Sequence, residues 1–484
     1  MKKSMSNYST WRKLNARNVG TTEEERKTFQ RDMPPRRVAV IGAGAAGLMA
    51  ARELQREGHT PVVFERGAAV GGNWRYDDAP ASAEDPLGAA GVDSSLYASL
   101  RTNLPRECMG FLDFPFVADA GAGTVSSYSD DPRRYPGHGE VLRYLEAFAR
   151  RFDLHGLVRL ETEVVSVRRD DASTGWKVSY CSRKLAVAGS AEPEVVKEEV
   201  FDAVAVCTGT STEPRVADIA GIDSWPGKQM HSHSYRVPGP FEGQVVVVVG
   251  YAPSGVDISR DIVSVAKEVH VARRSLATSG TESTALPNLW LHPMIERAEE
   301  NGSVVFQDGS RVKADAILHC TGYKYHFPFL GEEFGISVDD NRVGPLYKHV
   351  FPPRLAPSIS FIGLSLKSLV FPLLQLQSNW VAGVLSGRIV LPSQEGMTED
   401  VSSFYSKLQA KGCPKRHTHD LGECTYEYED WVAKQCGHEG IEGWRKEMFV
   451  AALKNFVHHP ESYRDEWEDD HLLSRAHLDF AKYF

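Results

Sequence analysis

The sequence lacks the short motifs on which many metal and thiol enzymes depend. Its 484 residues contain no CxxC pair, no HExxH and no GxSxG, which argues against a zinc ribbon, a redox-active disulfide, a zinc protease and a serine hydrolase. Histidine pairs occur at His231/His233 and His417/His419, but two histidines alone leave a zinc site incomplete. We therefore expect no metal site, and we interpret these histidines as framework or surface residues.

Cysteine is scarce, and no apolar run is long enough to cross a membrane. The chain has seven widely spaced cysteines, no stretch of 18 apolar residues and no secretory apolar region near its start. These features predict a reducing, cytoplasmic location and no transmembrane segment. The net charge of -9 is spread along the chain, so we expect no binding to nucleic acid or to anionic membranes. The length predicts two or three domains.

Two segments show little sign of packed structure. Residues 1–35 form a polar extension rich in Lys, Arg, Ser and Thr, in which Glu23, Glu24 and Glu25 argue against a transit peptide. We expect this extension to be a disordered tail. Residues 182–199 are polar and contain Gly and Pro, and they are predicted to form a surface loop.

The first folded unit begins at Arg37 with a dinucleotide-binding pattern. Residues 38–41 predict a buried strand, an amphipathic helix follows to about Glu57, and a second strand over 61–64 ends in Glu65. The turn before the helix consists of Gly42, Ala43, Gly44, Ala45, Ala46 and Gly47. Glycines at this spacing permit a tight turn and let a pyrophosphate approach the helix N-terminus, where unpaired N–H groups bind the anion.

The same pattern returns later in the chain. Residues 244–249 predict a strand, a helix follows through Glu268, and a short strand over 269–272 ends in Arg273 and Arg274. The turn before this helix consists of Gly250, Tyr251, Ala252, Pro253, Ser254 and Gly255, with alanine at the middle glycine position. Ser254 is expected to bind a pyrophosphate oxygen, to cap the helix, or both.

One charged position distinguishes the two units. Gly47 precedes Glu65 by 18 residues, and Gly255 precedes Arg273 by the same 18. A carboxylate here accepts a hydrogen bond from a ribose hydroxyl and repels a 2′-phosphate, whereas guanidinium groups bind that phosphate through charge-assisted hydrogen bonds. We therefore expect FAD in the first unit and NADPH in the second. The alternative is that Arg273 and Arg274 are a solvated strand end.

The segment between the two units resembles a known family. Residues 222–235, with Trp225, Gly227, His231 and Tyr235 in register, resemble the FxGxxxHxxx[YF] motif of the flavin-containing monooxygenases, in which the first aromatic is usually Phe. A Baeyer–Villiger enzyme usually has Trp in place of Tyr235. Further strings are similar to plant members of the glucosinolate S-oxygenase type, which oxidise thioethers: residues 96–111, 114–116, 133–136 and 463–470.

The resemblance, which runs from about Arg37 to Phe484, implies a fold and its division into domains. The expected fold is α/β, with two Rossmann-like dinucleotide-binding domains and the NADPH domain inserted in the FAD domain. The expected boundaries are a polar extension at 1–35, the FAD domain at 36–210 and 321–484 with a C-terminal helical region, and the NADPH domain at 211–320.

The resemblance also implies which residues contact the flavin. They are Gly72, Asn73 and Trp74 of a GGxW string, Thr102, Asn103, Thr321, Gly322 and Gln377. Gln375 stands where many relatives carry Glu, and the sequence leaves its role open. Gly227 keeps the register of the motif, and His231 and Tyr235 are expected to act structurally, on the linker between the two domains. The alternative for these two residues is a direct role in the chemistry.

The chemistry implied by the resemblance belongs mostly to the cofactors. NADPH reduces FAD, O2 adds at the flavin C4a carbon, and a soft nucleophile attacks the distal oxygen of the hydroperoxide. Asn103 is expected to orient the hydroperoxide and the retained NADP+, because its amide donates and accepts hydrogen bonds without titrating. The alternative for Asn103 is a turn asparagine before Pro105.

Several reactions fit this cofactor pair. The string over 101–111 favours sulfur, so the expected reaction is S-oxygenation of a thioether to a sulfoxide. N-hydroxylation of an amine and oxidation of an α-keto acid are the alternatives within the family. A flavin disulfide reductase shares the two-unit architecture but needs paired cysteines, and a nucleotide-bound redox sensor or scaffold without turnover is the non-catalytic alternative.

Overall fold

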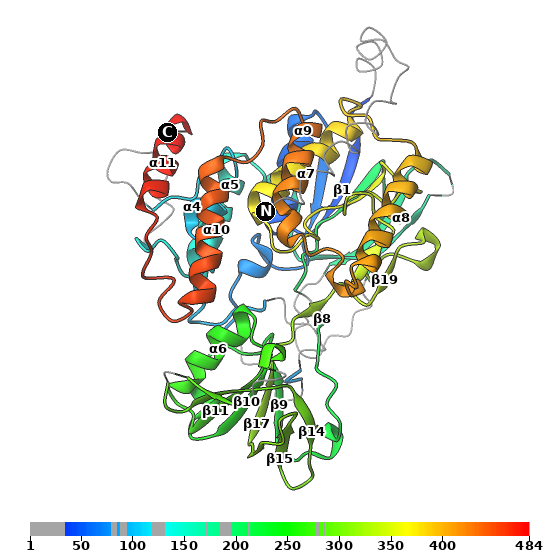
Figure 1. Cartoon of the computed structure of the whole chain (residues 1–484). Helices are drawn as coiled ribbons and strands as arrows, with labels where there is room; N and C mark the ends of the chain where they lie inside the picture. The colour runs from blue at the N-terminus through cyan, green and yellow to red at the C-terminus, as the bar shows by residue number, and fades with distance from the viewer. Residues whose placement is uncertain are drawn as a thin grey trace.

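Two sheets of mainly parallel strands organise the chain into two lobes. The computed structural model describes residues 34–78, 85–87, 94–118, 131–170, 172–182, 195–211, 213–276, 281–284 and 286–483. The lobes lie one above the other in Figure 1 and are joined near β8 (Glu213–Pro214). Nearly all of the extension predicted at 1–35 lies outside the described residues.

The larger lobe contains a parallel sheet with helices packed on it. The strands across this sheet are β21 (Ile359–Phe361), β7 (Ala203–Val206), β1 (Arg37–Ile41), β2 (Thr60–Phe64) and β3 (Val158–Arg159). After Arg37, β1 consists of buried Val, Ala and Ile, and β7 consists of buried Ala and Val, as expected for strands covered on both faces. α3 (Ala45–Arg56) connects β1 to β2 and packs against α7 (Val370–Leu385).

The smaller lobe repeats this arrangement. The strands across its sheet are β12 (Glu282–Ser283), β13 (Leu289–His292), β11 (Glu268–Ala272), β10 (Val245–Val249), β17 (Ala316–His319) and β9 (Lys228–His231), and among them β12 alone runs antiparallel. α6 (Pro253–Val263) connects β10 to β11. The prediction that this helix continues through Glu268 was wrong, because Glu268 opens β11 and pairs with Val245.

The strand order confirms the predicted fold class. β1, which precedes the first glycine turn, lies between β2 and β7. β10, which precedes the second glycine turn, lies between β11 and β17. In each case one neighbour is reached through the helix after the turn, and the other comes from later in the chain. β21 pairs with β7 although the whole second sheet lies between them in the sequence. The structure is therefore α/β, with one Rossmann-like unit inserted in the other.

The two connections between the lobes pair with each other. β8 leaves the larger lobe and β18 (Tyr323–Lys324) returns to it, and the two strands are antiparallel, with Tyr323 opposite Pro214. The chain passes between the two lobes through this short ribbon.

Smaller antiparallel sheets flank the two units. They consist of β4 (Thr162–Arg169), β5 (Trp176–Ser182) and β6 (Lys197–Phe201), of β14 (Ile295–Ala298), β15 (Ser303–Phe306) and β16 (Arg311–Lys313), and of β19 (Ser337–Asp339) and β20 (Arg342–Gly344). The surface loop predicted over 182–199 is wrong at both ends, because Ser182 closes β5 and residues 197–199 belong to β6, which pairs with β5. Residues 183–194 lie outside the described residues.

Helices complete the larger lobe. They are α4 (Arg106–Met109), α5 (His138–Arg151), α8 (Gln394–Ala410), α9 (Thr425–Gln435), α10 (Gly443–His458) and α11 (Asp470–Phe480). Their apolar faces share one core with α3 and α7, and the C-terminal helices α10 and α11 lie side by side in Figure 1. Among the described residues, no helix combines the length and hydropathy needed to cross a membrane.

Candidate active site

The glycine turn of the larger lobe has a backbone that requires glycine. Gly42 has φ +101°, and a Cβ atom there would lie 2.6 Å from the carbonyl oxygen of Cys207. A Cβ atom on Gly47 would lie 1.8 Å from the carbonyl oxygen of Gly42. α3 follows Gly44 without a side-chain cap, so the N–H groups of its first turn are available to an anion. The turn can therefore receive a phosphate.

Glu65 lies beside this turn, one residue beyond the end of β2. Its carboxylate accepts hydrogen bonds from the N–H of Ala43, 2.7 Å from Oε2, and from the N–H of Gly67, 2.8 Å from Oε1. Two backbone donors hold the carboxylate at the edge of the turn, where it can accept from a ribose hydroxyl and repels a 2′-phosphate. This geometry favours FAD over NADPH.

The GGxW string lies against the same turn. A Cβ atom on Gly72 would come within 2.8 Å of the Cα atom of Gly44, so the two loops touch through their backbones. The Asn73 side chain accepts a hydrogen bond from the Ser95 hydroxyl at 2.7 Å. Trp74 is half-buried and packs against the main core. Gly72 therefore forms one wall of the turn, while Asn73 holds a neighbouring loop.

The turn of the smaller lobe has the same backbone. Gly250 has φ +104°, and a Cβ atom there would lie 2.5 Å from the carbonyl oxygen of Cys320. A Cβ atom on Gly255 would lie 2.1 Å from the carbonyl oxygen of Gly250. The N-cap of α6 is Ala252, without a side-chain cap. The capping role considered for Ser254 is therefore wrong, since Ser254 lies two residues inside the cap, where its hydroxyl is exposed.

Arg273 occupies the position that Glu65 has in the larger lobe, one residue beyond the strand that follows the helix. Its guanidinium lies over the ring of Tyr251 in the turn, 5.6 Å from the centroid, and one terminal nitrogen is 3.6 Å from the Glu282 carboxylate. Its buried Nε atom has no hydrogen-bond partner among the described residues. Arg274 is exposed. A cation with an unused donor beside such a turn suits a 2′-phosphate.

The segment that contains Asn103 lies between the two lobes. Tyr97 and Ser99 donate hydrogen bonds to carboxylates on α6 of the smaller lobe, at 3.0 and 2.9 Å. Thr102 is buried, and its hydroxyl donates to the carbonyl oxygen of Leu104 at 2.9 Å. Asn103 is exposed, and its amide has no hydrogen bond to the rest of the described chain. That amide is therefore available to a ligand at the junction of the lobes.

Comparison with known proteins identifies the family. A family model described as flavin-binding monooxygenase-like matches residues 35–280 and 285–434. Flavin-containing monooxygenase FMO GS-OX-like 4 of Arabidopsis thaliana is 53% identical over 453 residues, which are 92% of this chain and 97% of the relative. The chain belongs to the flavin-binding monooxygenases.

Other relatives of this flavin monooxygenase are plant enzymes as well. Flavin-containing monooxygenase FMO GS-OX1 of Arabidopsis thaliana is 52% identical over 451 residues, covering 92% of this chain and 94% of the relative. The solved structure of S-allyl-L-cysteine S-oxygenase from Allium sativum is 52% identical and has a TM-score of 0.86, covering 93% of this chain and 99% of that chain. The predicted family and its plant branch are confirmed.

A flavin monooxygenase uses FAD and NADPH, so the predicted enzyme class and cofactors are confirmed. The residues present fit both groups. In the first turn, the absence of side chains at Gly44 and Gly72 leaves a cradle that a Cβ atom would narrow. In the second, the buried Nε of Arg273 is a donor still without an acceptor among the described residues.

His231 of the flavin-monooxygenase motif is wholly buried and structural. Its Nδ1 atom accepts from the N–H of His233 at 3.0 Å, and Nε2 lies 3.1 Å from the carbonyl oxygen of Gly322, to which it donates. Burial, and then the neighbouring His233 and His319, lower the pKa of His231 to about 4. The imidazole is therefore neutral at neutral pH, and it joins β9 to the strand that returns to the larger lobe.

The other two motif residues, Tyr235 and Gly227, also contact neighbouring parts of the protein. The Tyr235 hydroxyl donates to the carboxylate of Asp261 on α6 at 2.6 Å. At Gly227, a Cβ atom would lie 2.1 Å from the ring of Trp225, so the indole covers the glycine and leaves no room for a side chain. Both contacts lie within the smaller lobe, where Tyr235 holds the end of the motif against α6.

Thr321 and Gln377, which were predicted to contact the flavin, both form hydrogen bonds within the protein. The Thr321 hydroxyl donates to the carbonyl oxygen of Arg215. Gln377 is fully buried; its Oε1 atom accepts from the N–H of Gly363 at 3.0 Å and its Nε2 atom donates to the Tyr428 hydroxyl at 2.9 Å. Both side chains therefore hold loops rather than present a free group.

Gln375, whose role the sequence left open, also forms hydrogen bonds within the protein at both ends of its amide. Its Oε1 atom accepts from the N–H of Leu112 at 2.7 Å, and its Nε2 atom donates to the Asp113 carboxylate at 2.9 Å. The buried amide thus fixes the segment that follows α4 onto α7.

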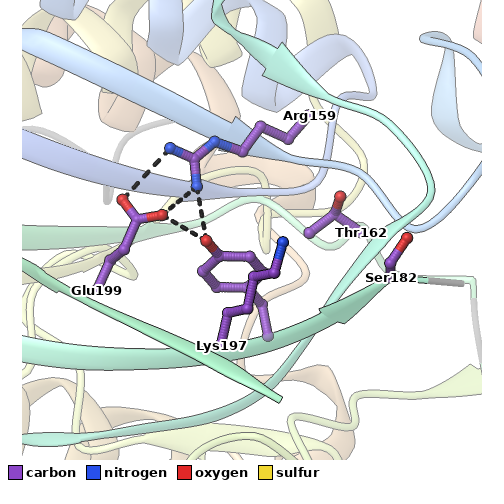
Figure 2. A pocket seen from close by; sticks show the side chains of 6 residues that line it. Arg159, Thr162, Ser182, Lys197 and Glu199 are labelled. Carbon is purple, nitrogen blue, oxygen red and sulfur yellow. Dashed lines mark hydrogen bonds and ion pairs between the residues drawn. The ribbon is translucent and has the colours of Figure 1, made fainter. Parts of the chain in front are cut away.

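A pocket of about 400 Å³ opens at the edge of the first sheet (Figure 2). Its charged groups are paired with one another, because Glu199 binds Arg159 at 2.5 Å and also accepts from the Tyr180 hydroxyl. The hydrogen bond from Arg159 is the main cause that lowers the pKa of Glu199 to about 2. The ion pair between Arg159 and Glu199 joins β3 to β6. Since these charged groups are already paired with each other, we do not assign oxygen transfer to this pocket.

Sequence reasoning did not identify one set of interacting residues at the lobe junction. Asp257 and Asp261 on α6 both accept hydrogen bonds from the larger lobe, and Arg464 near the C-terminus pairs with Asp257. The available signal was the spacing of four between the two aspartates, which places both on one face of a helix. The partner, 207 residues away, leaves no local pattern.

Proposed function

We propose that this flavin monooxygenase transfers one oxygen atom of O2 to the sulfur of a thioether. The sulfur is oxidised by two electrons to the sulfoxide, and NADPH supplies two more electrons as a hydride. The hydride and a proton from solvent provide the two hydrogens of the water in which the second oxygen atom leaves. The observation that carries this proposal is the likeness, along nearly the whole chain, to S-allyl-L-cysteine S-oxygenase.

The larger lobe, residues 36–210 and 321–484, is the proposed FAD domain. The pyrophosphate is assigned to the turn and helix start formed by Gly42, Ala43, Gly44, Ala45, Ala46 and Gly47, where the backbone leaves room for it. Glu65 accepts from the ribose, and Gly72, Trp74 and the backbone at Thr102 lie on the flavin side. When bound, FAD supplies the activation of O2.

The smaller lobe, residues 211–320, is the proposed NADPH domain. The turn from Gly250 through Tyr251, Ala252, Pro253, Ser254 and Gly255 receives the pyrophosphate, with the exposed Ser254 hydroxyl as an additional donor. Arg273, and to a smaller degree the exposed Arg274, bind the 2′-phosphate. When bound, NADPH supplies the electrons.

The proposed role of several polar residues is to hold the linkers and loops around the cofactor sites in place. Thr321, Gly322, His231 and Tyr235 fix the linkers, and Gln377 fixes the N–H of Gly363. The Asn73 side chain does the same for the loop at Ser95. Because their polar atoms are already bonded within the chain, their replacement should loosen the site without removing a direct ligand contact.

Asn103 is the proposed catalytic residue, because its free amide lies at the junction of the lobes. Asn103→Ala should retain bound flavin, yet most of the NADPH it oxidises should appear as H2O2 instead of sulfoxide. The ratio of H2O2 to NADPH measures this, with Asn301→Ala, in a turn of the smaller lobe, as the matched control. Coupling as tight as in the parent enzyme would remove Asn103 from the mechanism.

A panel of thioethers and amines tests the reaction itself. NADPH consumption, corrected for H2O2, is compared with product whose mass has gained one oxygen atom. Coupled sulfoxide formation supports the proposal. Faster N-oxygenation or α-keto-acid oxidation would replace sulfur as the target, and the absence of any turnover with bound flavin would favour a redox sensor or scaffold.

A reducing compartment such as the cytoplasm is the proposed location. All seven cysteines are free thiols, and Cys108, Cys181, Cys207 and Cys320 are buried. Free thiols persist where glutathione and thioredoxin keep them reduced. Alkylation of the protein after denaturation without reductant should label every cysteine, and incomplete labelling of protein drawn directly from cells would contradict this location.

A further inference from the structure

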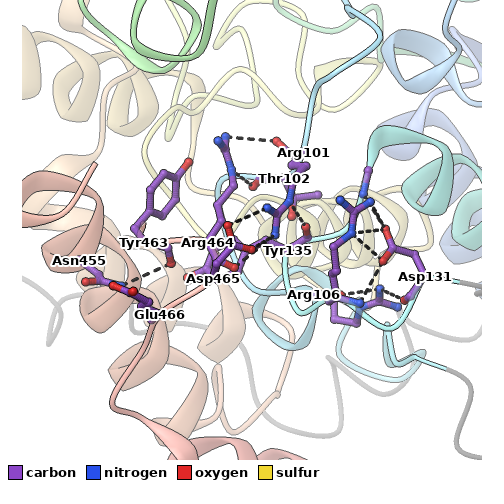
Figure 3. A network of polar contacts seen from close by, with 12 residues as sticks. Arg101, Thr102, Arg106, Asp131, Tyr135, Asn455, Tyr463, Arg464, Asp465 and Glu466 are labelled. Atoms are coloured by element: carbon purple, nitrogen blue, oxygen red, sulfur yellow. Dashed lines mark hydrogen bonds and ion pairs between the residues drawn. The ribbon is translucent and has the colours of Figure 1, made fainter. Parts of the chain in front are cut away.

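Three strings that resemble plant S-oxygenating enzymes meet at one place in the structure, and the proposed flavin chemistry uses only Thr102 and Asn103 among their residues. They are residues 96–111, 133–136 and 463–470. Arg101 donates through Nε to the carbonyl oxygen of Tyr135 at 2.9 Å and forms an ion pair of 2.9 Å with Asp465. Figure 3 shows these side chains converging between the segment at Arg101 and the C-terminal segment. The three strings therefore build a single polar cluster.

Arg464 extends this cluster to the smaller lobe. Its Nη1 and Nη2 atoms donate to the two carboxylate oxygens of Asp257 at 2.9 and 2.6 Å. Its Nε atom donates to the carbonyl oxygen of Thr102 at 2.9 Å, and Figure 3 shows the guanidinium pointing at this carbonyl and at that of Arg101. The Thr102 carbonyl belongs to the peptide bond that precedes Asn103. One guanidinium thus joins α6 to the backbone of Asn103.

Asp257 lies one helical turn beyond the N-terminus of α6, which starts at Pro253. Besides Arg464, it accepts from the Tyr97 hydroxyl at 3.0 Å. Arg260 on the next turn donates to the carbonyl oxygen of Pro460 in the C-terminal segment. The C-terminal segment therefore contacts the helix whose start is the proposed NADPH phosphate site.

The ion pair is well placed to restrain motion between the lobes. The Arg464 and Asp257 side chains are only 15% and 13% exposed, so water screens them less than a surface pair. A two-point contact between a planar guanidinium and a carboxylate fixes orientation as well as distance. The lobes are linked covalently through the β8–β18 ribbon. Away from the ribbon, the ion pair acts together with the hydrogen bonds from Tyr97 and Ser99 to α6, and contacts at a second place resist the rotation that the ribbon alone permits.

We propose that Arg464 is a positioning residue that locks the Thr102–Asn103 peptide to helix α6 and so holds the NADPH lobe in register with the Asn103 amide. This role rests on the proposed assignment of NADPH to the smaller lobe. Small errors in the placement of reacting groups cost rate. Loss of the clamp should therefore appear as poor coupling of NADPH oxidation to oxygen transfer, with little loss of coenzyme binding.

The test compares Arg464→Met, Arg464→Lys and Asp257→Asn in the full-length, FAD-loaded enzyme. Arg464→Met and Asp257→Asn should lower the fraction of NADPH that yields sulfoxide at least about fivefold while KM for NADPH changes less than about twofold. Arg464→Lys should lie between them and the parent, since an ammonium keeps the charge and loses the two-point contact. A merely structural role would lower flavin content, KM and kcat together.

Hydrogen exchange gives a readout that does not depend on turnover. Amides of residues 97–103 and of the first turns of α6 should exchange faster in Arg464→Met, with or without NADP+, because the restraint on both segments is gone. The matched control is Arg475→Met, which removes an arginine from an ion pair of 2.9 Å with Glu447 between α11 and α10 and touches neither segment. The charge-swapped pair Arg464→Asp with Asp257→Arg should restore part of the protection.

The results separate failure of the clamp from failure of the proposed function. Normal coupling and unchanged exchange in Arg464→Met would overturn the clamp, and so would equal effects of Arg475→Met. An Arg464→Met protein that does not fold leaves Arg464→Lys and the swapped pair to decide, and no protection in the swapped pair would count against the proposal. If the parent enzyme oxidises no thioether, the proposed reaction fails, while the exchange experiment still tests the clamp.

Discussion

The two glycine turns share a backbone and differ in what covers them. Gly42 and Gly250 have φ values of +101° and +104°, and a Cβ atom on either would lie 2.6 or 2.5 Å from an equivalent carbonyl oxygen, that of Cys207 or Cys320. In the larger lobe, α3 is buried along most of its length under α7. In the smaller lobe, Ala252, Pro253 and Ser254 at the helix start are exposed. The shared backbone therefore suits a dinucleotide in both lobes, and the start of the helix is more open to solvent in the second turn than the body of α3 is under α7.

The largest expected effect comes from adding one methyl group to the shared backbone. In Gly47→Ala, the Cβ atom would meet the carbonyl oxygen of Gly42 at 1.8 Å, so the turn must move at a cost of at least about 4 kcal/mol. We expect a protein without flavin or an unfolded one. Gly255→Ala should do the same damage in the smaller lobe, where FAD is retained and NADP+ binding is lost. Flavin absorbance per protein and NADP+ titration measure the two outcomes.

Gly139→Ala is the control for this comparison. Gly139 lies in α5, and nothing is within 4 Å of its added Cβ atom, so the substitution should change the free energy of unfolding by less than about 1 kcal/mol and in the stabilising direction. A Gly47→Ala enzyme with full flavin content and a parental melting temperature would mean that the first turn can relax, and that the two turns are not equivalent.

The second expected effect distinguishes the turns by charge. Arg273→Ala removes the buried donor beside Tyr251 and should weaken NADPH binding by about 2–4 kcal/mol while NADH binding hardly changes. Arg274→Ala should have a smaller effect, because Arg274 is exposed. Dissociation constants of NADP+ and NAD+ measure the discrimination. An equal loss for both coenzymes would show that Arg273 does not bind the 2′-phosphate.

The features that the sequence predicted are those governed by local rules. A glycine turn, its helix and the charge 18 residues later lie within one βαβ unit, so spacing alone places Glu65 and Arg273 at equivalent positions. The end of α6 was missed because it depends on pairing of Glu268 with Val245, a contact between strands.

Contacts between distant segments could not be predicted from the residues that make them. The resemblance predicts a flavin contact for Gln377, but no pattern in the sequence indicated that its amide also bonds to Gly363 and Tyr428. Arg464 was noted only within residues 463–470, which resemble plant S-oxygenases. Its ion pair was not predicted, because its partner Asp257 lies in the other lobe. Side-chain pairs of this kind have no periodicity, and tertiary packing alone brings them together.

The third expected effect comes from a strand position that differs between the sheets. His319 in β17 pairs with Val249 as Val206 in β7 pairs with Ile41. Burial lowers the pKa of His319 to about 4, whereas an unfolded histidine titrates near 6.5. Between these values the unfolded chain binds a proton that the folded chain excludes, so stability is full above about pH 6.5 and falls toward pH 4, by on the order of 1–3 kcal/mol.

His319→Val, which copies the larger lobe, tests this pH dependence. The variant should be less stable at neutral pH, because the N–H of Ala217 and the Gln229 side chain lose their partner. The drop in its melting temperature between about pH 7.5 and pH 5 should nevertheless be smaller than in the parent. An equally steep drop would assign the acid sensitivity to other buried histidines, such as His231.

The smallest expected effect concerns an acidic neighbour of the second turn. The Glu282 carboxylate lies 3.6 Å from a terminal nitrogen of Arg273, with the two side chains 44% and 26% exposed. A half-exposed pair is weak, so Glu282→Gln should release Arg273 and strengthen NADP+ binding by less than about 1 kcal/mol, an advantage that shrinks as salt rises. Glu296→Gln, which breaks an exposed pair with Arg297 in the same lobe, should leave the affinity unchanged. Weaker NADP+ binding in Glu282→Gln would mean that the carboxylate orients the guanidinium for the phosphate, so that the second turn, like the first, depends on an acid beside it.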